Sequence, residues 1–66
     1  MQRYFVEPHL FSEQEVTIVG DDVHHIVNVM RAKPGEKIVV CDGAGRSAVA
    51  QLVSLSAKEV TASIVQ

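Results

Sequence analysis

The residues most capable of chemistry lie close together in the first half of the chain. His24 and His25 are adjacent, Asn28 follows four residues after His24, and Arg31 ends the run. Adjacent helical side chains diverge by roughly 100°, so the two histidines do not readily share one metal ion. Neither histidine has a cysteine or carboxylate four residues further on, so the usual helical zinc spacing is absent. The pattern therefore favours a binding surface over a metal centre.

The single cysteine, Cys41, is the remaining candidate nucleophile, because a cysteine activated by a histidine can attack electrophilic substrates. No residue in the sequence is placed to orient such a pair, and Cys41 ends an apolar run that begins at Ile38. A lone cysteine cannot form an internal disulfide, which fits a reducing cytoplasm. We therefore expect a buried structural thiol, no catalytic residue and no independent enzyme.

The elements that must position these residues are mostly strands. Alternating or wholly apolar runs predict five of them, at residues 3–7, 15–19, 36–41, 47–55 and 60–64. Pro34 and Gly35 suit the central positions of a type II turn, and Asp42 with the two glycines that follow suits a hairpin loop. Several short strands predict a mostly β fold, a small barrel that closes its own edges.

One short helix is expected between the second and third strands. Asp21 or Asp22 is a natural N-cap, and Pro34 disfavours helical geometry in the residue before it, so the helix should end near Ala32. The apolar stripe of this helix should be buried, and it comprises Val23, Ile26, Val27 and Met30.

A polar face of the same helix should lie beside the apolar stripe. His24, Asn28 and Arg31 fall there at positions i, i+4 and i+7. We expect His24 and Asn28 to be at least partly exposed. This face and the turn that follows are the parts of the chain best suited to meet a ligand.

Length and composition restrict the function further. The 66 residues form at most one domain, residues 1–66, with little room for a deep catalytic cleft. Hydrophobic content of 47% and charged content of 21% are ordinary for a folded soluble domain. The sequence has neither a signal-peptide pattern nor an apolar run of about 20 residues. We expect a cytoplasmic protein without a membrane partner.

The net charge of −2 argues mildly against nucleic-acid binding, but the charge is unevenly distributed. Four acids lie between residues 13 and 22, whereas Glu36 is the only acid between residues 23 and 37. That second stretch holds Arg31, Lys33 and Lys37. Lysine and arginine hold phosphates, while asparagine and histidine can contact base edges. Arg31 and Lys33 beside His24 and Asn28 are therefore candidate RNA contacts, with a merely solvated surface as the alternative.

Short motifs also run through the whole chain. They are MQRYFV at residues 1–6, GDDVHHI at 20–26, VMR at 29–31, PGE at 34–36 and CDG at 41–43. In order and spacing they resemble the N-terminal domain of the bacterial 16S ribosomal RNA uridine-N3-methyltransferase family. No one of these motifs is specific by itself, but together they cover essentially the whole sequence.

The resemblance implies a PUA-like β-barrel that binds 16S rRNA of the small ribosomal subunit and positions it for methylation. In that family a SPOUT methyltransferase domain follows, binds S-adenosylmethionine and forms a homodimer. We expect that domain to be absent from this chain, which should then hold no cofactor and no catalytic residue. The alternatives are a protein-interaction barrel without an RNA role and, for the architecture, an OB-fold. The predicted RNA-binding residues are Arg3, His24, His25 and Arg31 from the resemblance, with Asn28 and Lys33 from the helix geometry.

Overall fold

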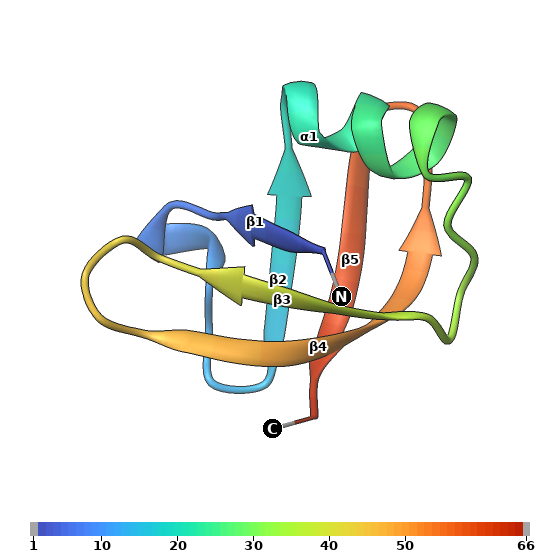
Figure 1. Ribbon diagram of the computed structural model, residues 1–66. Coiled ribbons are helices and arrows are strands. Elements are labelled where there is room, and N and C mark those ends of the chain that lie inside the picture. The colour runs from blue at the N-terminus through green and yellow to red at the C-terminus, as the bar shows by residue number, and fades with distance from the viewer. Residues whose placement is uncertain (1, 66) are drawn as a thin grey trace.

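The computed structural model describes residues 2–65 and contains five strands (Figure 1). Their bounds are β1 (Arg3–Phe5), β2 (Glu15–Val19), β3 (Lys37–Cys41), β4 (Ser47–Leu55) and β5 (Glu59–Ile64). A short 3-10 helix, η1 (Pro8–Leu10), follows β1. The strand pattern agrees with the sequence prediction, except that β1 ends at Phe5 instead of Glu7 and β3 and β5 are each shifted by one residue at their start.

The strands form one curled sheet in the order β1-β3-β4-β5-β2. The pair β1–β3 is parallel, and the other three pairs are antiparallel. The mostly β fold class, with one helical segment between the second and third strands, is confirmed. Closure is incomplete, because among the described residues no ladder joins β1 to β2 at the two ends of the strand order. Pro8 begins the 3-10 helix η1, and proline suits this first position because the missing N–H has no helical partner there.

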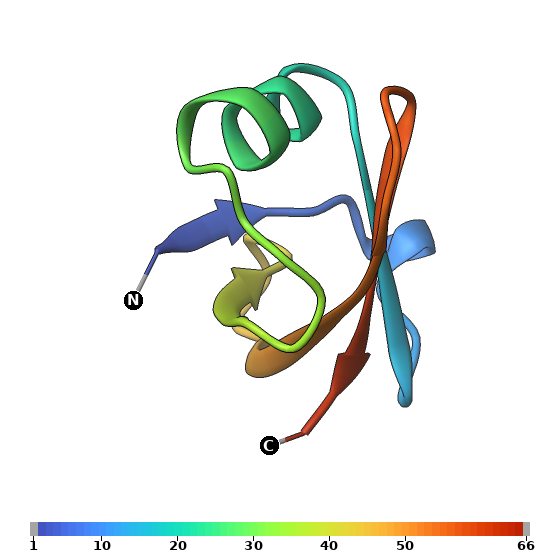
Figure 2. The same cartoon turned by 90° about the vertical axis from the view of Figure 1, so that its right-hand side faces the viewer.

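The helical segment lies over one end of the curled sheet (Figure 2). It begins as α1 (Asp21–His24) and continues as a π-helix, η2 (His25–Val29). The N-cap is Gly20, with φ of 80° and no side-chain cap, so the prediction of an aspartate N-cap is wrong. The sharp exit from β2 requires a positive φ, which glycine adopts without steric cost. Asp21 and Asp22 lie in the first helical turn instead, where the helix dipole favours negative charge.

The helix ends at Val29, about three residues before the predicted end at Ala32. The Met30 N–H donates to the His25 carbonyl at 2.8 Å, and the Ala32 N–H donates to the Ile26 carbonyl at 3.0 Å. These two hydrogen bonds span five and six residues instead of the four of an α-helix. Arg31 lies inside the second one, with a φ of 52°. Arg31 therefore lies on the turn after the helix, and the prediction that it continues the face of His24 and Asn28 is wrong. Left-handed residues that end helices are usually glycine or asparagine, which makes an arginine at this position unusual.

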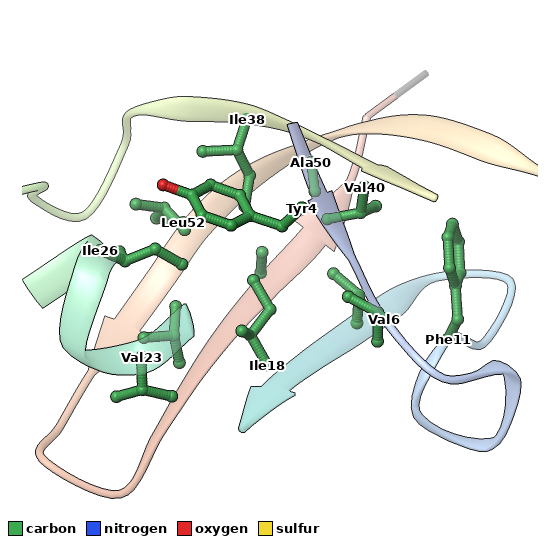
Figure 3. Close-up of a cluster of buried hydrophobic side chains, with 13 residues drawn as sticks. Tyr4, Val6, Phe11, Ile18, Val23, Ile26, Ile38, Val40, Ala50 and Leu52 are labelled. Carbon is green, nitrogen blue, oxygen red and sulfur yellow. The ribbon is translucent and has the colours of Figure 1, made fainter. Parts of the chain in front are cut away.

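The core fills the inside of the curled sheet (Figure 3). Val23 and Ile26 join it from the helix, as predicted, and Val27 is half-buried. Met30 is 43% exposed, so its predicted burial is wrong. It follows the last helical residue and lines a surface pocket. The core residues are Tyr4, Val6, Phe11, Val16, Ile18, Val23, Ile26, Ile38, Val40, Ala50, Leu52, Val60 and Ala62.

The hairpin loop between β3 and β4 is held by Asp42. Its Oδ1 accepts hydrogen bonds from the backbone N–H groups of Ala44 at 2.8 Å and Arg46 at 3.1 Å. The Ala44 bond foremost holds the pKa of the Asp42 carboxyl below its ordinary value. Cys41, just before the loop, is half-buried instead of fully buried, with its Sγ 3.5 Å from the Tyr4 carbonyl oxygen. The predicted hairpin loop is confirmed.

Candidate nucleic-acid interface

Tyr4 and His25 join β1 to the helix. The Tyr4 hydroxyl and His25 Nδ1 lie 3.0 Å apart in a hydrogen bond, and the two rings meet edge to face with centroids 5.8 Å apart. Tyr4 is 5% exposed, and its hydroxyl points toward the helical side of the core (Figure 3). His25 is half-buried, so the structure turns this predicted RNA-binding residue inward, where it packs and anchors.

Burial, followed by the charge of Asp22, raises the pKa of Tyr4 above its ordinary value of 10.0. A raised pKa means that the folded state holds the proton more tightly than the unfolded state. The associated stability is therefore complete below pH 10 and is lost as the pH rises through the pKa of the folded state. We expect Tyr4→Phe to lower the free energy of unfolding at neutral pH by about 1–2 kcal/mol, because His25 loses its partner. The variant should also lose less stability than the parent above pH 10, as urea denaturation at both pH values would measure.

His24 and Asn28 form the outward face of the helix. The Asn28 Nδ2 and His24 Nδ1 atoms lie 3.1 Å apart, and both side chains are exposed, as predicted. Donation from the Asn28 amide to Nδ1 leaves the His24 Nε2–H and the Asn28 Oδ1 directed to solvent. The pair thus offers two donors, the His24 Nε2–H and the second Asn28 Nδ2–H, and one acceptor oxygen to a polar ligand.

A surface pocket of about 400 Å³ lies between the end of η2, the segment after it and the start of β1. Its floor is apolar and buried, formed by Tyr4, Ile26 and Ile38. Met30 and Ala32 form one wall, and the polar rim consists of Gln2, Glu36 and Lys37.

The parallel pairing of β1 with β3 brings the two sides of this pocket together. Arg3 is in register with Val39, and the Val39 N–H donates to the Gln2 carbonyl at 2.8 Å. Because side chains alternate along a strand, Tyr4 points into the barrel while Arg3 points out. Gln2 and Lys37, which are 35 positions apart in sequence, therefore line the same pocket.

The turn that carries Lys33 is rigidly held. The Glu36 N–H donates to the Lys33 carbonyl at 3.1 Å, and the Lys33 N–H donates to the Glu36 Oε2 at 2.9 Å. Gly35 has a φ of 98°, as the predicted type II turn requires. The Gly35 N–H donates to the Leu52 carbonyl, and the Leu52 N–H donates to the Glu36 carbonyl, both at 2.8 Å. These hydrogen bonds to β4 thus fix the position of the turn that carries Lys33.

Positive charge gathers around this pocket. Lys37 lines it, Arg31 and Lys33 flank the lining residue Ala32, and Arg3 lies between Gln2 and Tyr4. All four cationic side chains are exposed. Across residues 2–65, the one ion pair joins His9 and Glu7 at 3.5 Å, so these four have no carboxylate partner. We call Arg3, Arg31, Lys33 and Lys37 the basic rim.

The other two of the six lysines and arginines lie elsewhere. Arg46 donates to the carbonyls of Phe11 and Ser12, at 3.2 and 2.6 Å, and its guanidinium stands 4.1 Å from the centre of the Phe11 ring. It fastens the hairpin loop to the segment before β2. Lys58 lies on the turn between β4 and β5. Within residues 2–65, the basic rim is therefore the single group of lysine and arginine side chains that make no ion pair.

The six predicted RNA-binding residues are now placed. Arg3, Arg31 and Lys33 belong to the basic rim, His24 and Asn28 form the outward helix face, and His25 turns inward. The six predicted residues do not include the lining residues Gln2, Met30 and Lys37, although the sequence marks Lys37 as a possible phosphate contact. The charge of Lys37, just after the Pro-Gly turn, indicates a possible phosphate contact. The pairing of β1 with β3 has no comparable sequence pattern.

No group of three or more histidine, cysteine, aspartate or glutamate side chains within residues 2–65 could hold a metal ion. No helix in that range has the length and apolar character needed to cross a membrane.

Comparison with known proteins finds close relatives in sequence. Residues 18–65 match the family model described as the RNA methyltransferase PUA domain. The whole chain is 38% identical to ribosomal RNA small subunit methyltransferase E of Bacillus subtilis, of which it spans 27%.

Solved structures resemble the fold closely. A predicted RNA methyltransferase from Thermotoga maritima superposes with a TM-score of 0.80 at 33% identity, covering 96% of this chain and 28% of that one. A ribosomal RNA small subunit methyltransferase E from Neisseria gonorrhoeae, bound to S-adenosyl methionine, gives a TM-score of 0.76 at 33% identity. That match covers 97% of this chain and 26% of the other. The chain thus spans about a quarter of the length of each relative.

Proposed function

The chain belongs to the RNA methyltransferase PUA domain family, and from this premise we propose that it is the RNA-binding domain of an S-adenosylmethionine-dependent 16S rRNA (uracil-N3)-methyltransferase. The observation that carries the proposal is the basic rim. Lys37 lines the pocket, the other three exposed cations are each adjacent in sequence to a lining residue, and none of the four has a carboxylate partner within residues 2–65. Unpaired lysine and arginine side chains are suited to phosphate oxygens, which supply much of the affinity in RNA recognition.

The acidic net charge is compatible with this role because the acids other than Glu36 lie outside the pocket lining. Glu36 is the only carboxylate that lines the pocket, and its Oε2 accepts a backbone hydrogen bond. Asp21 and Asp22 lie in the first turn of α1, and the other acids lie on loops and strands beyond the pocket lining. A local field of positive sign can attract RNA even where the total charge is negative.

In the parent enzyme this domain would position rRNA for a methyltransferase domain. The relatives are about four times longer than this chain, so we assign the catalytic residues, the cofactor site and the homodimer contact to their remaining part. We infer that the small ribosomal subunit is the partner and the cytoplasm the place of action, since the B. subtilis relative is named for rRNA methylation.

The cofactor of the parent does not suit the pocket of this chain. S-adenosylmethionine carries a positively charged sulfonium, and the basic rim would repel it. Glu36 is the single carboxylate that lines the pocket, and it is already engaged with the Lys33 N–H. We therefore place no step of methyl transfer on residues 2–65.

A salt series tests the RNA-binding role. The 66-residue chain should bind a 16S rRNA fragment with an affinity that falls as salt is raised, because phosphate contacts release counterions. Lys33→Ala should reduce the slope of log affinity against log salt by about one unit. Lys58→Ala, which removes the same charge from a remote turn, should leave the slope unchanged. Equal slopes for the two variants would place the RNA surface elsewhere.

The alternative is a protein-interaction barrel, and one observation favours it. A pocket of about 300 Å³ opens between the unpaired edges of β1 and β2, where Phe5 is 57% exposed and Val19 is 48% exposed. Such a surface suits an apolar partner. Failure of the salt series with retained folding would favour this function.

A further inference from the structure

We infer that the pocket between Gln2, Met30 and Lys37 receives one unpaired base of the bound RNA, a base with an amino group on its Watson–Crick edge. The inference rests on the proposed RNA-binding function and adds to it a site for a single nucleotide. The nucleotide bound in this pocket would therefore be a different one from the uridine that the parent would methylate.

The size and floor of the pocket suit a planar base. A volume of about 400 Å³ lies within the usual range for small ligands. The floor offers the buried apolar side chains of Ile26 and Ile38, and Met30 stands 43% exposed on the wall. A thioether packs well against aromatic rings. A base in the pocket would cover apolar surface of Met30 that the domain leaves in water.

The frame around the pocket is fixed before any ligand arrives. Hydrogen bonds tie the Lys33–Glu36 turn to β4, and the Tyr4–His25 bond ties the helix to β1. A pocket built on such elements loses little entropy when it binds. The flexible parts are the rim side chains, which can adjust to the edge of a base.

The polar residues that line the pocket, Gln2, Glu36 and Lys37, indicate which kind of base edge the pocket prefers. One Glu36 oxygen accepts the Lys33 N–H, and the other is free to accept a further donor. Within residues 2–65 the side chain of Gln2 makes no hydrogen bond, and Lys37 makes no ion pair. A carboxylate accepts from an amino group and repels carbonyl oxygens. Cytosine, adenine and guanine present an amino group, whereas uracil presents one N–H between two carbonyls, so uracil is disfavoured.

Phosphates on either side of the captured base would meet the basic rim. Lys37 lines the pocket itself, while Arg31 and Arg3 are next to lining residues in the sequence. A strand crossing the pocket can therefore keep its phosphates near cations while one base turns inward. This arrangement is typical of single-strand recognition, in which cations follow the backbone and apolar surfaces take bases.

Three oligomers of equal length test the inference with the 66-residue chain: oligocytidine, oligouridine and an abasic ribose-phosphate strand. The first two differ at the C4 position, which carries an amino group in cytosine and a carbonyl in uracil. Homopolymers also remove any dependence on register. By fluorescence anisotropy at fixed salt, we expect oligocytidine to bind roughly tenfold more tightly than the abasic strand, with oligouridine close to the abasic strand.

Variants assign the effect to the pocket. Ala32→Phe fills it and should bring oligocytidine to the abasic level, while the salt slope set by the basic rim stays unchanged. Ala57→Phe is the matched control on an exposed turn and should change nothing. Glu36→Gln keeps an acceptor for the Lys33 N–H but adds a donor, so it should erase the preference for cytosine over uracil.

The outcomes separate the two proposals. Salt-dependent binding that is equal for all three strands would overturn the pocket and leave the RNA-binding function intact. No binding to any strand would overturn both. If circular dichroism shows that Ala32→Phe is unfolded, Met30→Ser supplies the same test, because Met30 is a wall residue outside the core. A Met30→Ser variant that keeps the full preference for oligocytidine over the abasic strand would overturn the inference.

Discussion

Replacement of Arg31 by glycine is expected to weaken RNA binding while leaving the fold at least as stable. Arg31 has a φ of 52°, and a left-handed backbone costs a residue with a β-carbon about 1–2 kcal/mol. Glycine avoids that cost, but its greater conformational freedom stabilises the unfolded chain by about 0.4–1 kcal/mol. The free energy of unfolding should therefore rise by up to about 1 kcal/mol.

The same change removes one of the four cations of the basic rim. If Arg31 contacts a base, affinity for the 16S rRNA fragment should fall by about 1–3 kcal/mol, and a phosphate contact should instead reduce the salt slope by about one. Thermal denaturation and a binding titration on the same preparation measure both effects. Arg31→Ala is the matched comparison, since it removes the charge but keeps the β-carbon. Full affinity in both variants would exclude Arg31 from the RNA surface.

Ile26→Ala should have the largest effect on stability. Ile26 is 1% exposed and packs in the core from the helix that covers one end of the sheet (Figure 3). Truncation of a buried isoleucine costs about 2–5 kcal/mol, because it removes apolar contacts and leaves a cavity. A single hydrophobic core in a domain this small supplies only about 3–5 kcal/mol in total. Urea denaturation should show a variant that is largely unfolded at room temperature.

Val29→Ala is the control for that experiment. Val29 belongs to the same helical segment but is 60% exposed. Its truncation should change the free energy of unfolding by no more than about 0.5 kcal/mol. Equal losses in the two variants would mean that the helix packs through a different face from the one that the structure shows.

Local features of this protein could be predicted from its sequence alone. Alternation of Val16 and Ile18 with polar neighbours indicated β2, and the glycines after Asp42 indicated the hairpin loop. Pro34 and Gly35 indicated the turn that holds Lys33. The exposure of His24 and Asn28 was also predictable. Each of these depends on neighbours a few residues away, where steric limits and side-chain periodicity decide the backbone.

The site required the tertiary structure. The pairing of β1 with β3 places Gln2 beside Lys37, and no local pattern encodes the pairing of strands so far apart in sequence. The widened helix exposes Met30 and gives Arg31 its positive φ, against the regular 3.6-residue period. His25 turns inward because Tyr4 lies opposite it. The residue types that could bind RNA were thus evident from the sequence. Their positions near one pocket depend on how the whole chain packs.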